Sequence, residues 1–137
     1  MTHRDRSPAP SLLYVVKQLE LVTRAHLDAI VRESGVTALQ YTALTVLERR
    51  EGMTSADLVG GLERRGLIRR DPDPTNRRRR LISLTEDGRA LLRRQAEPVA
   101  ELEAHMVKDL DPDQRESFTE ALQMCRAALS DLPMDGD

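Results

Sequence analysis

Apolar residues recur every three or four positions between Ser11 and Ser34, which predicts a long amphipathic helix. The positions on its apolar face are Leu12, Val15, Val16, Leu19, Val22, His26 and Ile30. A second helix is predicted to begin at Thr37 and to end near Arg50, because Thr37 and Gln40 have the spacing of a capping box. Val36 and Tyr41 flank this box at the positions of a hydrophobic staple. Thr54 and Ser55 predict the cap of another helix.

Two further helices are predicted after residue 84. Thr85, followed by two acidic residues, begins a long helix that reaches about Leu110. Asp111, Pro112 and Gln114 then supply a cap, a first-turn proline and the third residue of a capping box. The final helix is expected to turn its apolar positions inward, and these are Phe118, Leu122, Cys125 and Leu129.

A β-hairpin is predicted between the helical segments, from Gly66 to Gly88. Gly66 suits the position just past a helix end, and residues 67–68 and 81–84 are short strand-like runs. Residues 71–76, Asp-Pro-Asp-Pro-Thr-Asn, have the composition of a turn that ends both strands. Arg77, Arg78, Arg79 and Arg80 follow this turn, so the returning strand begins with four positive charges.

The charge of the chain is concentrated by segment, although its formal net charge is only -2. Residues 62–94 hold eleven Arg and five acidic residues, whereas residues 95–137 hold three basic and eleven acidic ones. A positive field confined to one module is typical of a nucleic-acid contact surface. The alternative is a solvated arginine-rich surface, which is the usual explanation of a charge run.

The element order is helix, helix, helix, hairpin, helix, helix, which predicts a mainly α fold with a small β-hairpin, the winged helix-turn-helix. We expect one domain over residues 1–137, with a DNA-binding lobe at 37–88. The helices at 11–34 and 89–132 are too apolar to complete their burial on so small a lobe, so they are expected to form a dimer interface. A two-fold dimer would present two hairpins to a pseudo-palindromic duplex.

Several motifs resemble those of the multiple antibiotic resistance regulator (MarR) family of winged-helix transcription factors. They are Gly-Val-Thr-Ala-Leu-Gln-Tyr at 35–41, Leu-Glu-Arg-Arg-Gly-Leu-Ile-Arg-Arg at 62–70, Asp-Pro-Thr-Asn-Arg-Arg at 73–78 and Leu-Thr-Glu-Asp-Gly at 84–88. The resemblance implies a homodimeric repressor or activator in which Arg78 of the wing enters the minor groove. It also implies a small aromatic effector bound between the dimer helices and the DNA-binding lobe. The expected DNA-binding residues are Arg69, Thr75, Asn76, Arg77, Arg78, Arg79 and Arg80, and the candidate effector contacts are His26 and Tyr41.

The sequence departs from the family at two places. Asn76 stands where the family usually has an Asp that helps to hold the wing arginine. Residues 54–65 are twelve residues long and include Gly60 and Gly61, whereas a helix-turn-helix needs on the order of 20 residues. Either the recognition helix is lacking, or a segment of the natural chain is missing between Leu58 and Val59. In the first case the protein is a dimeric interaction or ligand-binding protein without specific DNA readout.

Other chemistry has little support in the sequence. We expect no enzyme, because there is no phosphate-binding loop, serine elbow or pair of carboxylates at a candidate cleft. No metal or other cofactor is expected, since the three His residues lack metal-ligand spacing. Cys125 is expected to be a buried small hydrophobe. The absence of a membrane-spanning run and of a signal peptide predicts a cytoplasmic protein.

Overall fold

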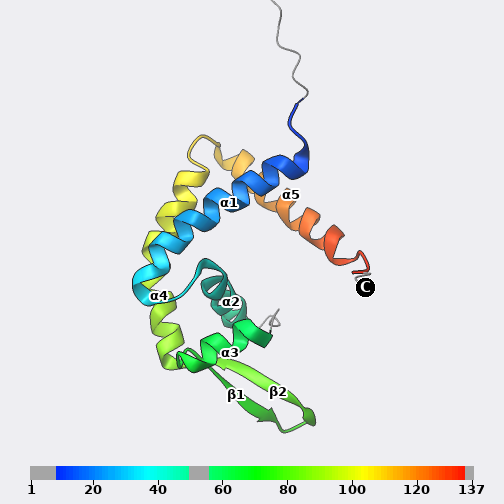
Figure 1. Cartoon of the computed structure of the whole chain (residues 1–137). Helices are drawn as coiled ribbons and strands as arrows, with labels where there is room; N and C mark the ends of the chain where they lie inside the picture. Colours follow the sequence, from blue (N-terminus) through cyan, green and yellow to red (C-terminus); the bar gives the residue numbers. More distant parts are fainter. Residues whose placement is uncertain (1–8, 50–55, 135–137) are drawn as a thin grey trace, which may run out of the picture. The chain divides into compact units, whose positions relative to one another are not determined.

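The computed structural model describes residues 9–49 and 56–134, with side chains in the second range from residue 59. It is mainly α-helical with one antiparallel two-stranded hairpin, as predicted (Figure 1). The elements in chain order are α1 (Leu12–Val31), the 3₁₀ turn η1 (Arg32–Ser34), α2 (Ala38–Glu48), α3 (Ala56–Arg64), β1 (Ile68–Asp73), β2 (Asn76–Leu84), α4 (Glu86–Met106) and α5 (Pro112–Ser130). The chain divides into two compact units, residues 1–100 and 101–137.

Two of the predicted helix starts, those of α2 and α5, are confirmed by their capping hydrogen bonds. At α2, the Thr37 side chain accepts from the Gln40 backbone N–H at 3.1 Å, and the Gln40 side chain accepts from the Thr37 N–H at 3.0 Å. Asp111 and Gln114 form the same reciprocal pair at the start of α5. Each pair satisfies two of the backbone donors that a helix end leaves without a partner. The end of α2 at Glu48 lies close to the predicted one.

The hydrophobic core of the first unit lies where α1, α2, α3 and the first part of α4 meet the base of the hairpin. Val36 and Tyr41, the predicted staple pair, both belong to this buried cluster. Its fully buried members are Val31, Leu44, Leu62 and Ile68. The core therefore joins the helices to the first residue of β1, which fixes the root of the hairpin.

Helix α3 is a single nine-residue helix between α2 and the hairpin. Leu58 and Val59 are consecutive residues of this helix, so the structure has no spatial gap at that point. A segment of the natural chain that is missing between these two residues stays a prediction. The predicted cap at Thr54 and Ser55 lies outside the described residues.

Large apolar side chains are exposed on α1 in the first unit and on α5 in the second. On α1, Leu12 is 75% exposed and Val22 is 57% exposed. Along α5 only Phe118 is half-buried, so the expected burial of Cys125 is wrong for the single chain. Leu122 and Leu129 are likewise exposed rather than turned into a core of this chain. Among the described helices, none is long and apolar enough to cross a membrane.

Candidate nucleic-acid interface

The hairpin is fixed at its root by Thr85, the residue before α4. The Thr85 hydroxyl donates to the Gly66 carbonyl oxygen at 2.6 Å and accepts from the Gly88 N–H at 3.1 Å. The Thr85 N–H donates to the Leu67 carbonyl oxygen at 3.1 Å. Gly88 has no room for a side chain, because a Cβ there would overlap that same Leu67 oxygen. The Leu-Thr-Glu-Asp-Gly motif therefore lies where the backbone at the start of α4 passes close to the backbone of residues 66–67.

Gly66 turns the chain from α3 into β1, as predicted. Its φ of 72° is left-handed, a conformation that glycine adopts without strain. The Leu67 N–H donates to the Leu62 carbonyl oxygen at 3.1 Å, and the Gly66 N–H donates to the Glu63 carbonyl oxygen at 2.9 Å. These two bonds close the end of α3 in a Schellman-type turn.

The strands are longer than the sequence predicted. Of the residues expected in the turn, Asp71, Pro72 and Asp73 belong to β1 and Asn76 belongs to β2, so the turn itself consists of Pro74 and Thr75. Pro72 is tolerated because a two-stranded sheet has only edge strands, where a missing N–H costs little. The prediction that the arginine run lies on the returning strand is confirmed, since residues 77–80 all lie in β2.

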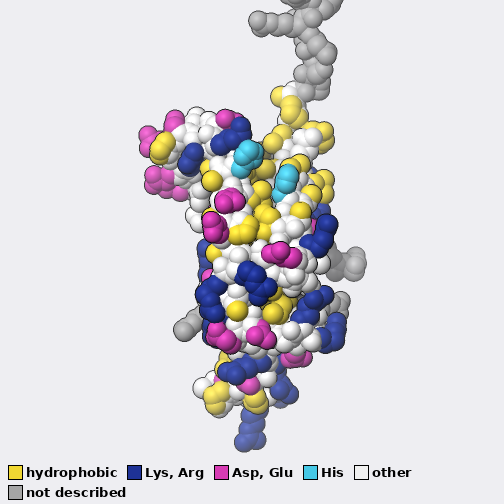
Figure 2. Space-filling view, turned by 90° about the vertical axis from the view of Figure 1, so that its left-hand side faces the viewer, with side chains coloured by type: hydrophobic (Ala, Val, Ile, Leu, Met, Phe, Trp, Pro, Cys, Tyr) yellow, Lys and Arg dark blue, Asp and Glu magenta, His cyan; other side chains and the backbone are white. Residues whose placement is uncertain are grey.

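Three of these arginines form a bulge. The register passes from the pair Asp73–Asn76 to the pair Pro72–Arg80, so Arg77, Arg78 and Arg79 have no partner residue on β1. We call these three residues the arginine bulge. A bulge twists and bends its strand and re-aims the side chains of the extra residues. All four arginines of residues 77–80 are exposed, and Figure 2 shows Lys and Arg side chains at the end of the hairpin, at the bottom of the view.

Asp73 organises the turn beside the bulge, a role that was not predicted from the sequence. Its carboxylate accepts from the Thr75 hydroxyl at 2.7 Å and from the Thr75 N–H at 2.9 Å. The two bonds lower the pKa of Asp73 below its ordinary value of 3.8, with a smaller contribution from the positive charge of Arg79. An Asp two residues before Thr is the local signal of such a turn.

Asn76 shapes the backbone of the arginine bulge. Its Oδ1 accepts from the Arg78 N–H at 3.1 Å, so this amide bonds the main chain of Arg78. Elsewhere on the hairpin, Arg69 pairs with Asp71 at 3.2 Å and Arg70 with Glu63 at 3.3 Å. In the part of the chain that the structure describes, the arginines of residues 77–80 form no such ion pair. The bulge therefore presents positive charge with no carboxylate of the described residues within 4.0 Å.

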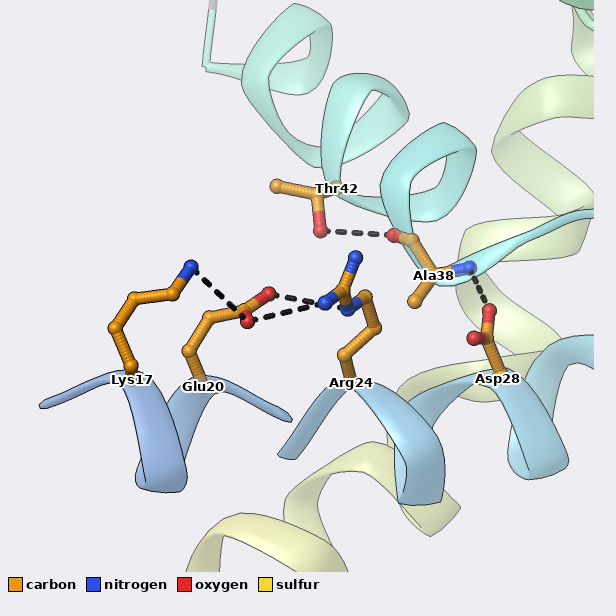
Figure 3. A network of polar contacts seen from close by, with 6 residues as sticks. All are labelled: Lys17, Glu20, Arg24, Asp28, Ala38 and Thr42. Carbon is orange, nitrogen blue, oxygen red and sulfur yellow. Dashed lines mark hydrogen bonds and ion pairs between the residues drawn. The ribbon is translucent and has the colours of Figure 1, made fainter. Parts of the chain in front are cut away.

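The two candidate effector contacts differ in burial. His26 is exposed on α1, so its expected inward position is wrong for the single chain. Tyr41 is only 7% exposed and belongs to the core. Polar contacts also lie along α1 where it faces α2: Glu20 bridges Lys17 and Arg24, and Asp28 accepts from the Ala38 N–H at 2.5 Å (Figure 3).

Solved structures of bacterial regulators share this architecture. MepR of S. aureus in complex with DNA has a TM-score of 0.74 and 22% identity, over 88% of this chain and 99% of its own. CouR of Rhodococcus jostii RHA1, a repressor bound to a DNA duplex, has a TM-score of 0.71 and 25% identity, over 85% and 92%. A MarR-family regulator from Rhodococcus sp. RHA1 has a TM-score of 0.70 and 18% identity, over 84% and 96%. This chain has the MarR fold.

Within the MarR fold, β1 and β2 are the wing, and α2 and α3 belong to the winged-helix lobe. At the level of sequence, a segment of 39 residues is 44% identical to the transcriptional regulator HosA of Escherichia coli O111:H-. That segment is 28% of this chain and 29% of HosA. No protein-family model matches the chain.

Proposed function

We propose that this protein is a dimeric DNA-binding transcriptional regulator, with the wing as its principal contact to duplex DNA. The observation that carries this proposal is the arginine bulge, three exposed guanidinium groups that lack a carboxylate partner in the described residues. Guanidinium groups bind phosphates through paired hydrogen bonds and enter narrow minor grooves. The expected contacts are Arg69, Thr75, Asn76, Arg77, Arg78, Arg79 and Arg80.

The order of the wing tip favours DNA binding over a solvated charged surface. Asp73 and Asn76 use their side chains to bond the backbone of the turn and of the bulge. A preformed turn reduces the entropy that is lost when the arginines bind.

The exposed apolar faces of α1 and α5 support a homodimer, because large apolar surfaces on a soluble chain mark interfaces. CouR has been solved with p-coumaroyl-CoA, which supports a small-molecule effector for this protein too. We place His26 and Tyr41 at the border of the effector site. The proposed regulator is a cytoplasmic repressor rather than an enzyme.

A binding titration of Arg78→Ala tests the proposal. We expect specific duplex binding to weaken by about 1 to 3 kcal/mol, which is roughly 5- to 150-fold. Arg94→Ala on α4, exposed like Arg78, is the matched control and is expected to change affinity less than Arg78→Ala. Thermal melts of both variants exclude unfolding. Unchanged affinity of Arg78→Ala at fixed salt contradicts the assignment.

A second candidate function rests on the length of α3. The described residues between α2 and the wing contain this nine-residue helix, with Gly60 and Gly61 inside it, where a helix-turn-helix has two helices. Without a recognition helix, the dimer is an interaction protein that does not read base sequence. Intact mass separates the two candidates: a mass above 15.5 kDa by more than a kilodalton restores a recognition helix, and a mass of 15.5 kDa favours the interaction protein.

A further inference from the structure

A solvent-open hollow lies beside the start of α2, away from the wing residues described above. Its volume is about 520 Å³, within the size range of small-molecule sites. It is lined by Asp28, Arg32, Gly35, Val36, Thr37, Gln40 and Arg65. These residues come from the end of α1, η1, the start of α2 and the end of α3, all in the first unit.

Two arginines give this hollow its charge. Arg32 lies in η1, and Arg65 directly follows α3. Among the described side chains, no carboxylate lies within 4.0 Å of either guanidinium group. Asp28, the acid of the lining, accepts from the Ala38 N–H at 2.5 Å and so is engaged at the start of α2. The hollow therefore combines two positive charges with a carboxylate that is already bonded elsewhere.

Gly35 leaves space for the guanidinium group of Arg65. A Cβ at Gly35 would lie 2.6 Å from Nη1 of Arg65, so the guanidinium group occupies space that a side chain would otherwise fill. Gly35 also has a left-handed φ of 76°. The absence of a side chain at residue 35 thus leaves the space that the Arg65 guanidinium group occupies at the wall of the hollow.

The walls favour a compact ligand. Val36 is the apolar side chain of the lining, so the hollow offers little surface for a flat aromatic ring. The N–H groups of Thr37, Ala38 and Gln40 are already bonded to side chains, which leaves the arginines as the main donors. Carboxylates and phosphates are the groups that match paired guanidinium donors.

We propose that this hollow binds a compact anion, a small organic acid or a phosphate ester, between the guanidinium groups of Arg32 and Arg65. A bound anion ties the end of α1 to the residue that precedes Gly66 and the wing. The regulatory consequence, a change in DNA affinity, rests on the proposed function. Binding of the anion to the hollow does not depend on the proposed function.

Calorimetric titration without DNA tests the site, with succinate and inorganic phosphate as probes at constant ionic strength. We expect saturable binding of at least one probe to the wild type, and the tighter probe identifies the carboxylate or the phosphate as the preferred group. Arg32→Ala and Arg65→Ala should each weaken binding by about tenfold or more, because each removes charge-assisted hydrogen bonds. Arg64→Ala, exposed next to Arg65 but outside the lining, is the matched control and should stay within about twofold.

Two results overturn the site. The first is no saturable binding of either probe up to about 50 mM, a limit well beyond millimolar affinity. The second is an equal loss in Arg64→Ala and Arg65→Ala, which means that the probe responds only to the diffuse positive field. Thermal melts confirm that the variants are folded.

A separate DNA titration keeps the two proposals distinguishable. The tighter probe at saturation should change the DNA affinity of the wild type and leave that of Arg65→Ala unchanged. Anion binding with no change in DNA affinity overturns the regulatory consequence and supports the site. Anion binding by a protein that binds no DNA supports the site and contradicts the proposed function.

Discussion

The substitution Thr85→Val removes one hydroxyl that serves both ends of the wing root. This hydroxyl accepts from the Gly88 N–H at the start of α4 and donates to the Gly66 carbonyl oxygen at the end of α3. Loss of a helix N-cap costs about 1 kcal/mol. Loss of the bond to Gly66 adds about 1 kcal/mol, since Thr85 is half-buried and water compensates only in part. We expect the free energy of unfolding to fall by about 2 kcal/mol.

Urea denaturation followed by circular dichroism measures this change. Wild type and variant are compared at one protein concentration, because the stability of a dimer depends on concentration. Thr42→Val is the matched control: Thr42 is exposed, and its hydroxyl donates only within α2, to the Ala38 carbonyl oxygen at 2.9 Å. It should change stability by less than about 0.5 kcal/mol. Equal effects of the two substitutions refute the role assigned to Thr85.

Three further predictions concern single contacts. Gly88→Ala should destabilise the fold by about 1 to 3 kcal/mol in the same assay, because its Cβ overlaps the Leu67 carbonyl oxygen. The pKa of Asp73 is lowered in the folded state, so its stabilising contribution is present above pH 3.8 and is lost as the pH falls through the lowered pKa. The difference in stability between wild type and Asp73→Asn should therefore shrink between about pH 7 and pH 2. Gln95 is 1% exposed, and its amide N–H donates to the Ser34 hydroxyl at 2.6 Å, while its Oε1 has no hydrogen-bond partner among the described residues. Ser34→Ala should therefore cost more stability than Gln95→Leu, measured by thermal melts.

The helix starts were predictable because their determinants are local. Thr37 with Gln40, and Asp111 with Gln114, bond each other across three residues, so the sequence contains the whole structural unit. The sequence predicted that the wing is a β-hairpin but did not predict the length of its strands. Pro72 and its acidic neighbours have turn composition, and only the pairing with β2 extends the strand through them.

Burial and the anion site depended on contacts that no local pattern encodes. The sequence identifies an apolar face at Cys125 but not whether its own chain or another chain covers that face. Arg65 approaches Gly35 from 30 residues away, and Asp28 reaches Ala38 from ten residues away. Such pairs become visible only when the helices are placed in space.

Selection of duplexes from a random DNA pool tests the central claim most directly. The wild-type protein is expected to enrich duplexes with two-fold related half-sites about one helical turn, roughly 34 Å, apart. The Arg78→Ala variant should enrich them less at the same salt concentration. A selection in which the wild type enriches no sequence over the starting pool contradicts the account and favours the interaction protein.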